Sequence, residues 1–306
     1  MDIKSKKWIE IRPKSKLKYF FWSDPFRLPK DDNILNNFSK RGIEFVIALG
    51  KHTMNAKCYD RIQSLIDNSI GINVCIMDKD FAHLDNSHKF KEIYKMLRNT
   101  KIFKYVKEIY IDAEISSKYR KNIKNLPLNK KLTYIFNENP NKNEIIKAIR
   151  DYNRLINSVH SDNKRFGIIR SISSAYEIDK ITRNVPFDEI DEDITITMVY
   201  RVPEGREKEY KDFWFYQIAK KEGDNIFLGD IKDGYRSLKE DITICSYLKK
   251  NRVYIYDYHG FKKFNKLEDL EPYKRYKIKK DVWEFVKHTA KISSFEIADK
   301  FLKFFK

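Results

Sequence analysis

Cysteine and glycine are both scarce in this sequence. The three cysteines, Cys58, Cys75 and Cys245, lie far apart and form no Cys-x-x-Cys pair, which argues against a disulfide framework or a structural zinc site. The chain has nine glycines, and neither phosphate-binding pattern, G-x-G-x-x-G or G-x-x-x-x-G-K, occurs in it. Cys75 and Cys245 fall within apolar patterns, so we expect them to be buried thiols.

Long hydrophobic runs are absent as well. The sequence has no stretch of about 18 consecutive apolar residues, which predicts that no segment spans a membrane. The opening stretch, MDIKSKKWIEIRPKSK, lacks the apolar core of a secretory signal. We therefore expect a cytoplasmic protein.

Basic residues, in contrast, are abundant. Lys and Arg number 62 against 44 Asp and Glu, which gives a formal net charge of +18. A charge of this sign attracts nucleic acid, anionic lipid or acidic substrates. The basic residues are spread along the whole chain, but the stretches 5–22 and 273–280 interleave them with aromatic residues. Nucleic acid is therefore one candidate partner.

Eight short apolar runs recur along the chain, and most are continuously apolar rather than alternating. This pattern is typical of strands that are covered on both faces in a parallel sheet. The runs span 17–22, 44–50, 72–78, 106–112, 131–136, 165–170, 194–200 and 252–258. Helical patterns separate most of the runs, at 31–42, 58–71, 85–99, 141–158, 204–223 and 236–250.

This alternation predicts an α/β protein, and its rhythm favours a (β/α)8, TIM-like barrel that residues 1–306 form as a single domain. The longer gap before the last run predicts an insertion at about 201–251, between the seventh and eighth strands. An open, doubly wound parallel sheet is the alternative. The stretch SDPFRLP, which follows the first run in place of a glycine-rich loop, counts against a nucleotide-binding version of that sheet.

Acidic residues follow most of the predicted strands. TIM barrels carry their chemistry at the carboxyl ends of the strands. The carboxylates at these ends are Asp24, Asp78, Asp80, Asp112, Glu114, Glu138 and Asp257, whereas the opposite ends begin mostly with Lys, Arg, Gly or Asn. Helix caps account for part of this bias, because Asp, Asn and Ser favour the position before a helix. The remainder predicts a carboxylate-rich catalytic site.

The stretch EIYIDAEIS, residues 108–116, concentrates this signal. Asp112 and Glu114 lie two positions apart, so in a strand they project from one face. Crowded carboxylates shift each other's pKa values apart, which suits acid/base catalysis. Asp257, Asp24 or Glu138 is the expected second carboxylate. The candidates for substrate binding are Trp22, Tyr200, Arg201, Tyr258, His259 and Asp80.

The sequence IDAE at the end of the fourth predicted strand resembles the glycoside hydrolase barrels whose fourth strand ends in Asp-x-Glu, such as chitinase-type enzymes and lysozyme-like muramidases. In those families the Glu is the general acid, and the nearby Asp supports the charge that develops. The resemblance implies these roles for Glu114 and Asp112. Chitinase-type enzymes carry two earlier Asp residues in this strand, where this chain has Lys107 and Tyr110.

Two other functions stay open on the sequence alone. Carboxylates at the strand ends bind Mg²⁺ or Mn²⁺ in many proteins, which would indicate a divalent-metal phosphoesterase. The six histidines form neither H-x-H nor H-E-x-x-H. The other alternative is a non-catalytic barrel that binds nucleic acid or another polyanion through its basic surface. We predict a glycan or another small molecule as substrate, and no cofactor, with Mg²⁺ as the alternative.

Overall fold

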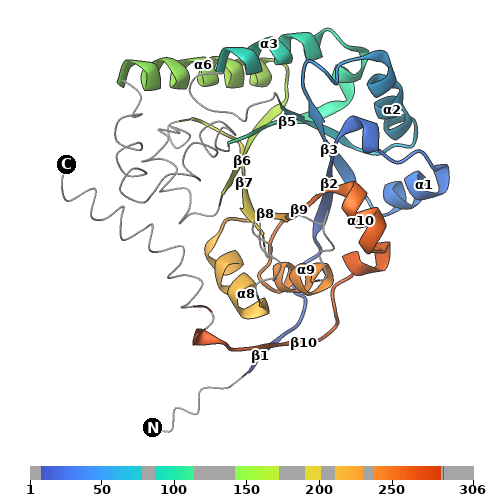
Figure 1. Ribbon diagram of the computed structural model, residues 1–306, viewed down its shortest axis with the longest axis vertical. Coiled ribbons are helices and arrows are strands. Elements are labelled where there is room, and N and C mark those ends of the chain that lie inside the picture. Colours follow the sequence, from blue (N-terminus) through green and yellow to red (C-terminus); the bar gives the residue numbers. More distant parts are fainter. Residues whose placement is uncertain are drawn as a thin grey trace, which may run out of the picture. The chain divides into compact units, whose positions relative to one another are not determined.

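A computed structural model describes residues 8–77, 87–113, 142–171, 190–200, 211–229, 237–283 and 285. Eight strands, β2 to β9, form a closed barrel in chain order (Figure 1). The predicted TIM-like barrel is therefore confirmed, and the doubly wound alternative is wrong because the sheet closes on itself. The chain divides into unit 1, residues 1–23 with 196–306, and unit 2, residues 24–195. Each unit is described by itself below.

Unit 2 contains four neighbouring parallel strands. They are β3 (Glu44–Leu49), β4 (Ile72–Ile76), β5 (Val106–Asp112) and β6 (Arg165–Ser171). Every residue of β3 and β4 is buried, which agrees with their continuously apolar sequences. In the register of β5 and β6, Tyr110 lies opposite Gly167 and Asp112 lies opposite Ile169.

Helices alternate with these strands, as the sequence predicts. They are α1 (Asp32–Lys40), α2 (Ala56–Asp67), α3 (Ser87–Arg98) and α6 (Lys142–Ser161), with short 3-10 turns at η1 (Pro25–Arg27) and η3 (Lys101–Tyr105). The first two begin at side-chain caps, where Asp31 accepts from the amide of Asn33 at 2.9 Å and Asn55 accepts from that of Cys58 at 3.2 Å. Helices α3 and α6 lie side by side (Figure 1).

A buried tyrosine joins α3 to the end of α6. The hydroxyl of Tyr94 donates to a carboxylate oxygen of Asp162 at 2.6 Å, and Arg98 donates to the other oxygen at 2.8 Å. Tyr94 is only 2% exposed. Burial raises the pKa of Tyr94, and the hydrogen bond to Asp162 raises it further.

We expect Tyr94→Phe to lower the free energy of unfolding by about 1.5 kcal/mol at neutral pH, because a hydrogen bond to a charged group is lost. Above pH ~10 the Tyr94 hydroxyl stays protonated in the native state but loses its proton in the unfolded state. The unfolded state then binds fewer protons, so in the wild type the contribution of Tyr94 to stability falls as the pH rises further. The deficit of the variant should therefore shrink above pH ~10. Urea unfolding at neutral and alkaline pH measures this, and a deficit that stays constant with pH would contradict it.

Unit 1 contributes the other barrel strands, in the order β7 (Ile194–Val199, from Ile196 onward), β8 (Asn225–Leu228), β9 (Arg252–Tyr256) and β2 (Lys18–Ser23). Its helices are α8 (Asp212–Lys221), α9 (Leu238–Tyr247) and α10 (Tyr258–Phe264), with the 3-10 turn η6 (Leu267–Leu270). A second, two-stranded sheet pairs β1 (Trp8–Ile11) with β10 (Tyr276–Lys279) in antiparallel fashion.

One barrel strand is not where the sequence places it. Residues 225–228 fall in the predicted insertion at 201–251, between the helical patterns 204–223 and 236–250, yet they form β8 between β7 and β9. Conversely, β5 pairs directly with β6, so the barrel includes no strand between them. The predicted strand at 131–136 lies outside the described residues. The prediction of a single domain over residues 1–306 stays a prediction.

The few cysteines and the lack of long apolar runs can both be compared with the structure. Cys58, Cys75 and Cys245 are all buried and free, which confirms the two thiols expected in the core. Among the residues that the structure covers, no helix has the length and apolar character needed to cross a membrane.

Candidate active site

Strand β5 carries a row of polar side chains along one face. Glu108, Tyr110 and Asp112 alternate with apolar residues, so they share that face of the strand. All three are buried, with exposed fractions of 6%, 0% and 8%. The hydroxyl of Tyr110 donates to the carboxylate of Glu108. Asp112 is the last residue of the strand, so it lies at the end where TIM barrels carry their chemistry.

The neighbouring strand leaves room for this row. Gly167 on β6 lies opposite Tyr110, and a Cβ atom at Gly167 would stand 2.4 Å from the Cδ1 atom of the Tyr110 ring. Only a residue without a side chain lets the two strands pair while the ring occupies this space. The ring of Tyr110, the neighbour of Asp112 in the row, is thereby fixed against β6.

Asp24 and Asp257, two of the predicted catalytic carboxylates, are helix caps. In unit 2, Asp24 accepts from the amide of Phe26 at 2.7 Å and begins η1. In unit 1, Asp257 accepts from the amide of Gly260 at 2.7 Å and begins α10, and it is 2% exposed. Both residues follow a barrel strand directly, so the capping preference explains their positions without excluding a further role.

Aromatic side chains gather at the carboxyl ends of the unit 1 strands. Trp22 of β2 and Tyr256 of β9 are partners in the register, and their ring centroids lie 4.7 Å apart. Phe227 of β8 contacts Tyr256 at 6.0 Å and Tyr200 at 6.1 Å. The ring of Tyr200 covers Gly229, where a Cβ would lie 2.2 Å from it. Two predicted substrate-binding residues, Trp22 and Tyr200, thus belong to one aromatic cluster.

The other predicted binding residues lie elsewhere. Tyr258 is 3% exposed and packs edge-to-face on Phe21 at 5.8 Å, so its side chain belongs to the core. His259 is exposed on α10. Five further candidates lie outside the described residues: Glu114, Glu138, Arg201, Asp78 and Asp80.

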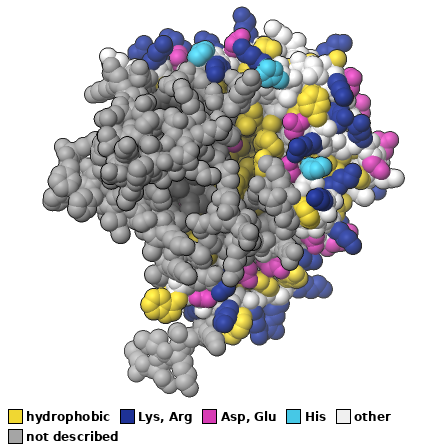
Figure 2. Space-filling view, viewed as in Figure 1, with side chains coloured by type: hydrophobic (Ala, Val, Ile, Leu, Met, Phe, Trp, Pro, Cys, Tyr) yellow, Lys and Arg dark blue, Asp and Glu magenta, His cyan; other side chains and the backbone are white. Residues whose placement is uncertain are grey.

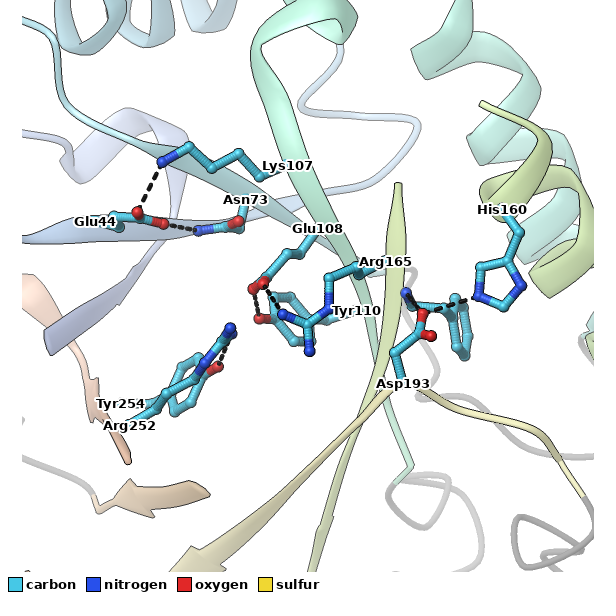
Figure 3. A network of polar contacts seen from close by, with 11 residues as sticks. Glu44, Asn73, Lys107, Glu108, Tyr110, His160, Arg165, Asp193, Arg252 and Tyr254 are labelled. Carbon is cyan, nitrogen blue, oxygen red and sulfur yellow. Dashed lines mark hydrogen bonds and ion pairs between the residues drawn. The ribbon is translucent and has the colours of Figure 1, made fainter. Parts of the chain in front are cut away.

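The amino ends of the unit 2 strands hold a polar network that sequence reasoning missed (Figure 3). Glu44, the first residue of β3, accepts from Asn73 at 3.0 Å and from Lys107 at 2.8 Å. Arg165, the first residue of β6, donates to Glu108 at 3.4 Å. Buried carboxylates therefore also lie near the amino ends of β3 and β5, where sequence reasoning expected mostly Lys, Arg, Gly or Asn.

A third carboxylate at this end joins α6 to β6 (Figure 3). Asp193 accepts from the backbone amide of Phe166 at 2.7 Å and lies 2.8 Å from Nε2 of His160. Partial burial by itself raises the pKa of Asp193, but the amide and the imidazole together hold it below its usual value. Contacts at the amino ends of barrel strands indicate a role in stability rather than catalysis.

Charge and metal-binding capacity complete the description of the site. Figure 2 shows Lys and Arg side chains spread among Asp and Glu over most of the described part of one face. Within the described ranges, no three His, Cys, Asp or Glu side chains come together as a metal site. Several of the carboxylates considered for Mg²⁺, including Glu114 and Asp80, lie outside those ranges.

No family model matches the sequence, and no curated protein matches it either. Some solved structures are similar to the chain at a low level. A truncated 3-deoxy-D-arabino-heptulosonate 7-phosphate synthase from Thermotoga maritima is 11% identical, with a TM-score of 0.38 over 91% of this chain and 87% of that chain. The TIM-like fold follows from the closed barrel of β2 to β9 and not from this low similarity.

Two larger proteins contain a similar part. A xylose isomerase-like TIM barrel/4-hydroxyphenylpyruvate dioxygenase fusion protein is 8% identical, with a TM-score of 0.43 over 80% of this chain and 39% of that chain. An endo-β-mannanase/endo-β-glucanase from Prevotella bryantii is 10% identical, with a TM-score of 0.43 over 81% of this chain and 42% of that chain. Identities this low concern the fold alone.

Proposed function

We propose that the protein hydrolyses glycosidic bonds, with Glu114 as general acid/base and Asp112 as its charged partner. The observation that supports this most directly is the burial of Asp112, 8% exposed, at the carboxyl end of β5. Burying a carboxylate is costly, so proteins retain one at such a position for a structural or chemical role. The carboxyl end of a TIM-barrel strand favours the chemical role.

In the proposed reaction, Glu114 gives its proton to the glycosidic oxygen as the bond from that oxygen to the anomeric carbon breaks. A water molecule supplies the hydroxyl group to the anomeric carbon, and its proton passes to a carboxylate. The negative charge of Asp112 stabilises the positive charge that develops on the sugar ring. The same charge, two residues before Glu114, favours the protonated form of Glu114 that must act as the acid.

The second carboxylate of the proposed reaction is Asp257, Asp24 or Glu138. The capping bonds of Asp24 and Asp257 allow a clean test of the first two. Asparagine is as good a cap as aspartate, so Asp24→Asn and Asp257→Asn keep the hydrogen bond to the backbone and remove only the charge. Glu138→Gln removes the charge of the third candidate in the same way.

Unit 1, taken by itself, offers an aromatic cluster of a kind that suits a sugar. Trp22 and Tyr256 are half-buried residues at the carboxyl ends of β2 and β9. Flat aromatic rings with an exposed face suit the apolar faces of sugar rings.

The deciding experiment is a hydrolysis assay of the full chain on aryl glycosides, polysaccharides and phosphoesters, with EDTA or added Mg²⁺. We expect glycoside hydrolysis that does not depend on the metal, and a loss of about 10- to 100-fold in kcat/KM for Asp112→Asn, because charge stabilisation is removed. Asp60→Asn, an exposed carboxylate of α2, is the matched control and should behave like the wild type.

Three results would overturn the proposal. They are hydrolysis of phosphoesters that requires Mg²⁺, glycoside hydrolysis that Asp112→Asn leaves unchanged, and an absence of hydrolysis across the panel.

A further inference from the structure

The two-stranded sheet of β1 and β10, here called the ribbon, has two unlike faces. Its inner face carries Ile11 and Ile278, both 0% exposed, and packs against α8 and α9 (Figure 1). The hydroxyl of Tyr276, also on this face, donates to Asp212 of α8. The inner face therefore anchors the ribbon within unit 1 and leaves the other face to solvent.

The outer face of the ribbon consists of exposed side chains, most of them basic. The antiparallel register places Trp8 opposite Lys279 and Glu10 opposite Lys277. Residues directly opposite each other in a sheet lie within side-chain contact distance. The alternation of side chains extends this face by one position beyond each strand. It therefore comprises Trp8, Glu10, Arg12, Arg275, Lys277 and Lys279.

The only carboxylate of this outer face is neutralised by arginine. Glu10 pairs with Arg275 at 2.6 Å and with Arg12 at 3.3 Å. The hydrogen bond from Arg275 and the charges of both guanidinium groups hold the pKa of Glu10 below its usual value. Among the residues that the structure describes, neither Lys277 nor Lys279 forms an ion pair. The outer face is thus left with a net positive charge and two available lysines.

A half-exposed tryptophan lies in the midst of this charge. Trp8 is 48% exposed, although tryptophan has a large and mostly apolar side chain. Lys277 and Lys279 share a face of β10, and two residues of a strand span roughly 7 Å. That span is comparable to the distance between successive phosphates of an extended nucleic-acid strand.

We propose that the outer face of the ribbon binds single-stranded nucleic acid, with a base stacked on Trp8 and the adjoining phosphates bound by Lys277 and Lys279. Aromatic stacking combined with cationic phosphate contacts is the general mode of single-strand binding. A duplex would fit poorly, because its bases are already stacked on each other and no base face is free for Trp8.

This inference is independent of the proposed hydrolysis. It uses residues of the ribbon alone, and no group assigned to the active site takes part. Nucleic-acid binding at the ribbon and glycoside hydrolysis are measured by separate assays, so either proposal can fail while the other holds.

The test uses the full chain and a fluorescently labelled oligothymidylate or oligouridylate of about 15 nucleotides, a length that spans a typical binding site. We expect binding in roughly 50 mM salt that weakens steeply as salt increases. Trp8→Ala should weaken binding about tenfold, because one stacked base is lost. Lys277→Ala with Lys279→Ala should reduce the magnitude of the negative slope of log K against log salt by about 1.4, since two phosphate contacts are lost.

The matched controls lie in η3 of unit 2, where an exposed tyrosine also stands beside basic residues. Lys104 lies 4.8 Å from the ring centroid of Tyr105, which is 42% exposed. Tyr105→Ala, and the pair Lys101→Ala with Lys104→Ala, remove the same kinds of group and should leave binding unchanged. The ribbon variants change an exposed face, so their thermal unfolding should match that of the wild type.

Preference for the DNA or the RNA strand would identify the natural ligand within the proposed class. No binding at low salt, equal effects of the ribbon and control variants, or equally tight binding of a duplex would each overturn the proposal.

Discussion

Glu114→Gln should reduce glycoside hydrolysis by about 1000-fold in kcat, in the range typical for loss of a general acid. Glutamine has nearly the shape of glutamic acid but has no acidic proton to give to the glycosidic oxygen. Binding contacts are retained, so KM should change little, and the loss should fall on the chemical step. Steady-state kinetics on an alkyl or aryl glycoside measures both constants.

The choice of leaving group makes this prediction specific to proton donation. A substrate whose leaving group is a strongly acidic phenol needs no proton in order to depart. The Glu114→Gln variant should therefore recover much of its first-step rate on such a substrate, whereas a variant that is merely misfolded would not.

The pH profile provides an independent criterion. The basic limb of the wild-type kcat/KM profile reports the acid in its protonated form, so this limb should disappear in Glu114→Gln. Glu92→Gln is the control, because Glu92 is an exposed residue of α3 whose ion pair with Lys51, at 2.8 Å, contributes little to stability. Equal losses on good and poor leaving groups would assign Glu114 a role other than general acid.

Gly167→Ala should destabilise the protein by about 3 kcal/mol, which is a large part of the stability of a typical domain. The added methyl group would stand 2.4 Å from Cδ1 and 2.5 Å from Cε1 of the Tyr110 ring. The ring has no space to withdraw, because Tyr110 is 0% exposed and its hydroxyl is bonded to Glu108. Urea unfolding followed by circular dichroism measures the loss.

Two further variants isolate the cause of this effect. Gly223→Ala is the matched control, since a Cβ at Gly223 has no atom within 4 Å, and its stability should stay close to that of the wild type. Tyr110→Ala removes the two nearest atoms that the new methyl group meets and leaves only the backbone oxygen of Ile194, at 3.2 Å. Gly167→Ala in that background should therefore cost at least about 1 kcal/mol less than in the wild type. Additive losses would show that the clash with the ring is not the source.

The barrel itself could be predicted from the sequence, but not the identity of all its strands. Continuous apolar runs such as 72–78 and 106–112 match β4 and β5 closely, because strands buried on both faces leave a clear pattern. The strand β8 has only four residues, NIFL, and such a run is too short to be told from a loop by periodicity. The run KLTYIF at 131–136 has the stronger pattern, and it lies outside the described residues.

Positions at strand ends could also be predicted, whereas pairings across strands could not. Asp112 lies at the end of β5 as expected from the run that precedes it. The partnership of Glu44 with Lys107 depends on three strands lying in a particular order and register. Neither order nor register is visible in a single sequence. The one available signal was an acidic residue at the start of an apolar run, as with Glu44.

The two units differ in how their residues are distributed along the chain, and this has a consequence for synthesis on the ribosome. Unit 2 is one continuous segment, so its strands β3 to β6 can pair while later residues are still being made. Strand β2 has to wait for β9, and β1 for β10, because these partners lie near opposite ends of the sequence. Contacts of such long separation form slowly. Closure of the barrel therefore has to wait until β9 has been made, and until then the nascent chain exposes the apolar strand β2 to chaperones.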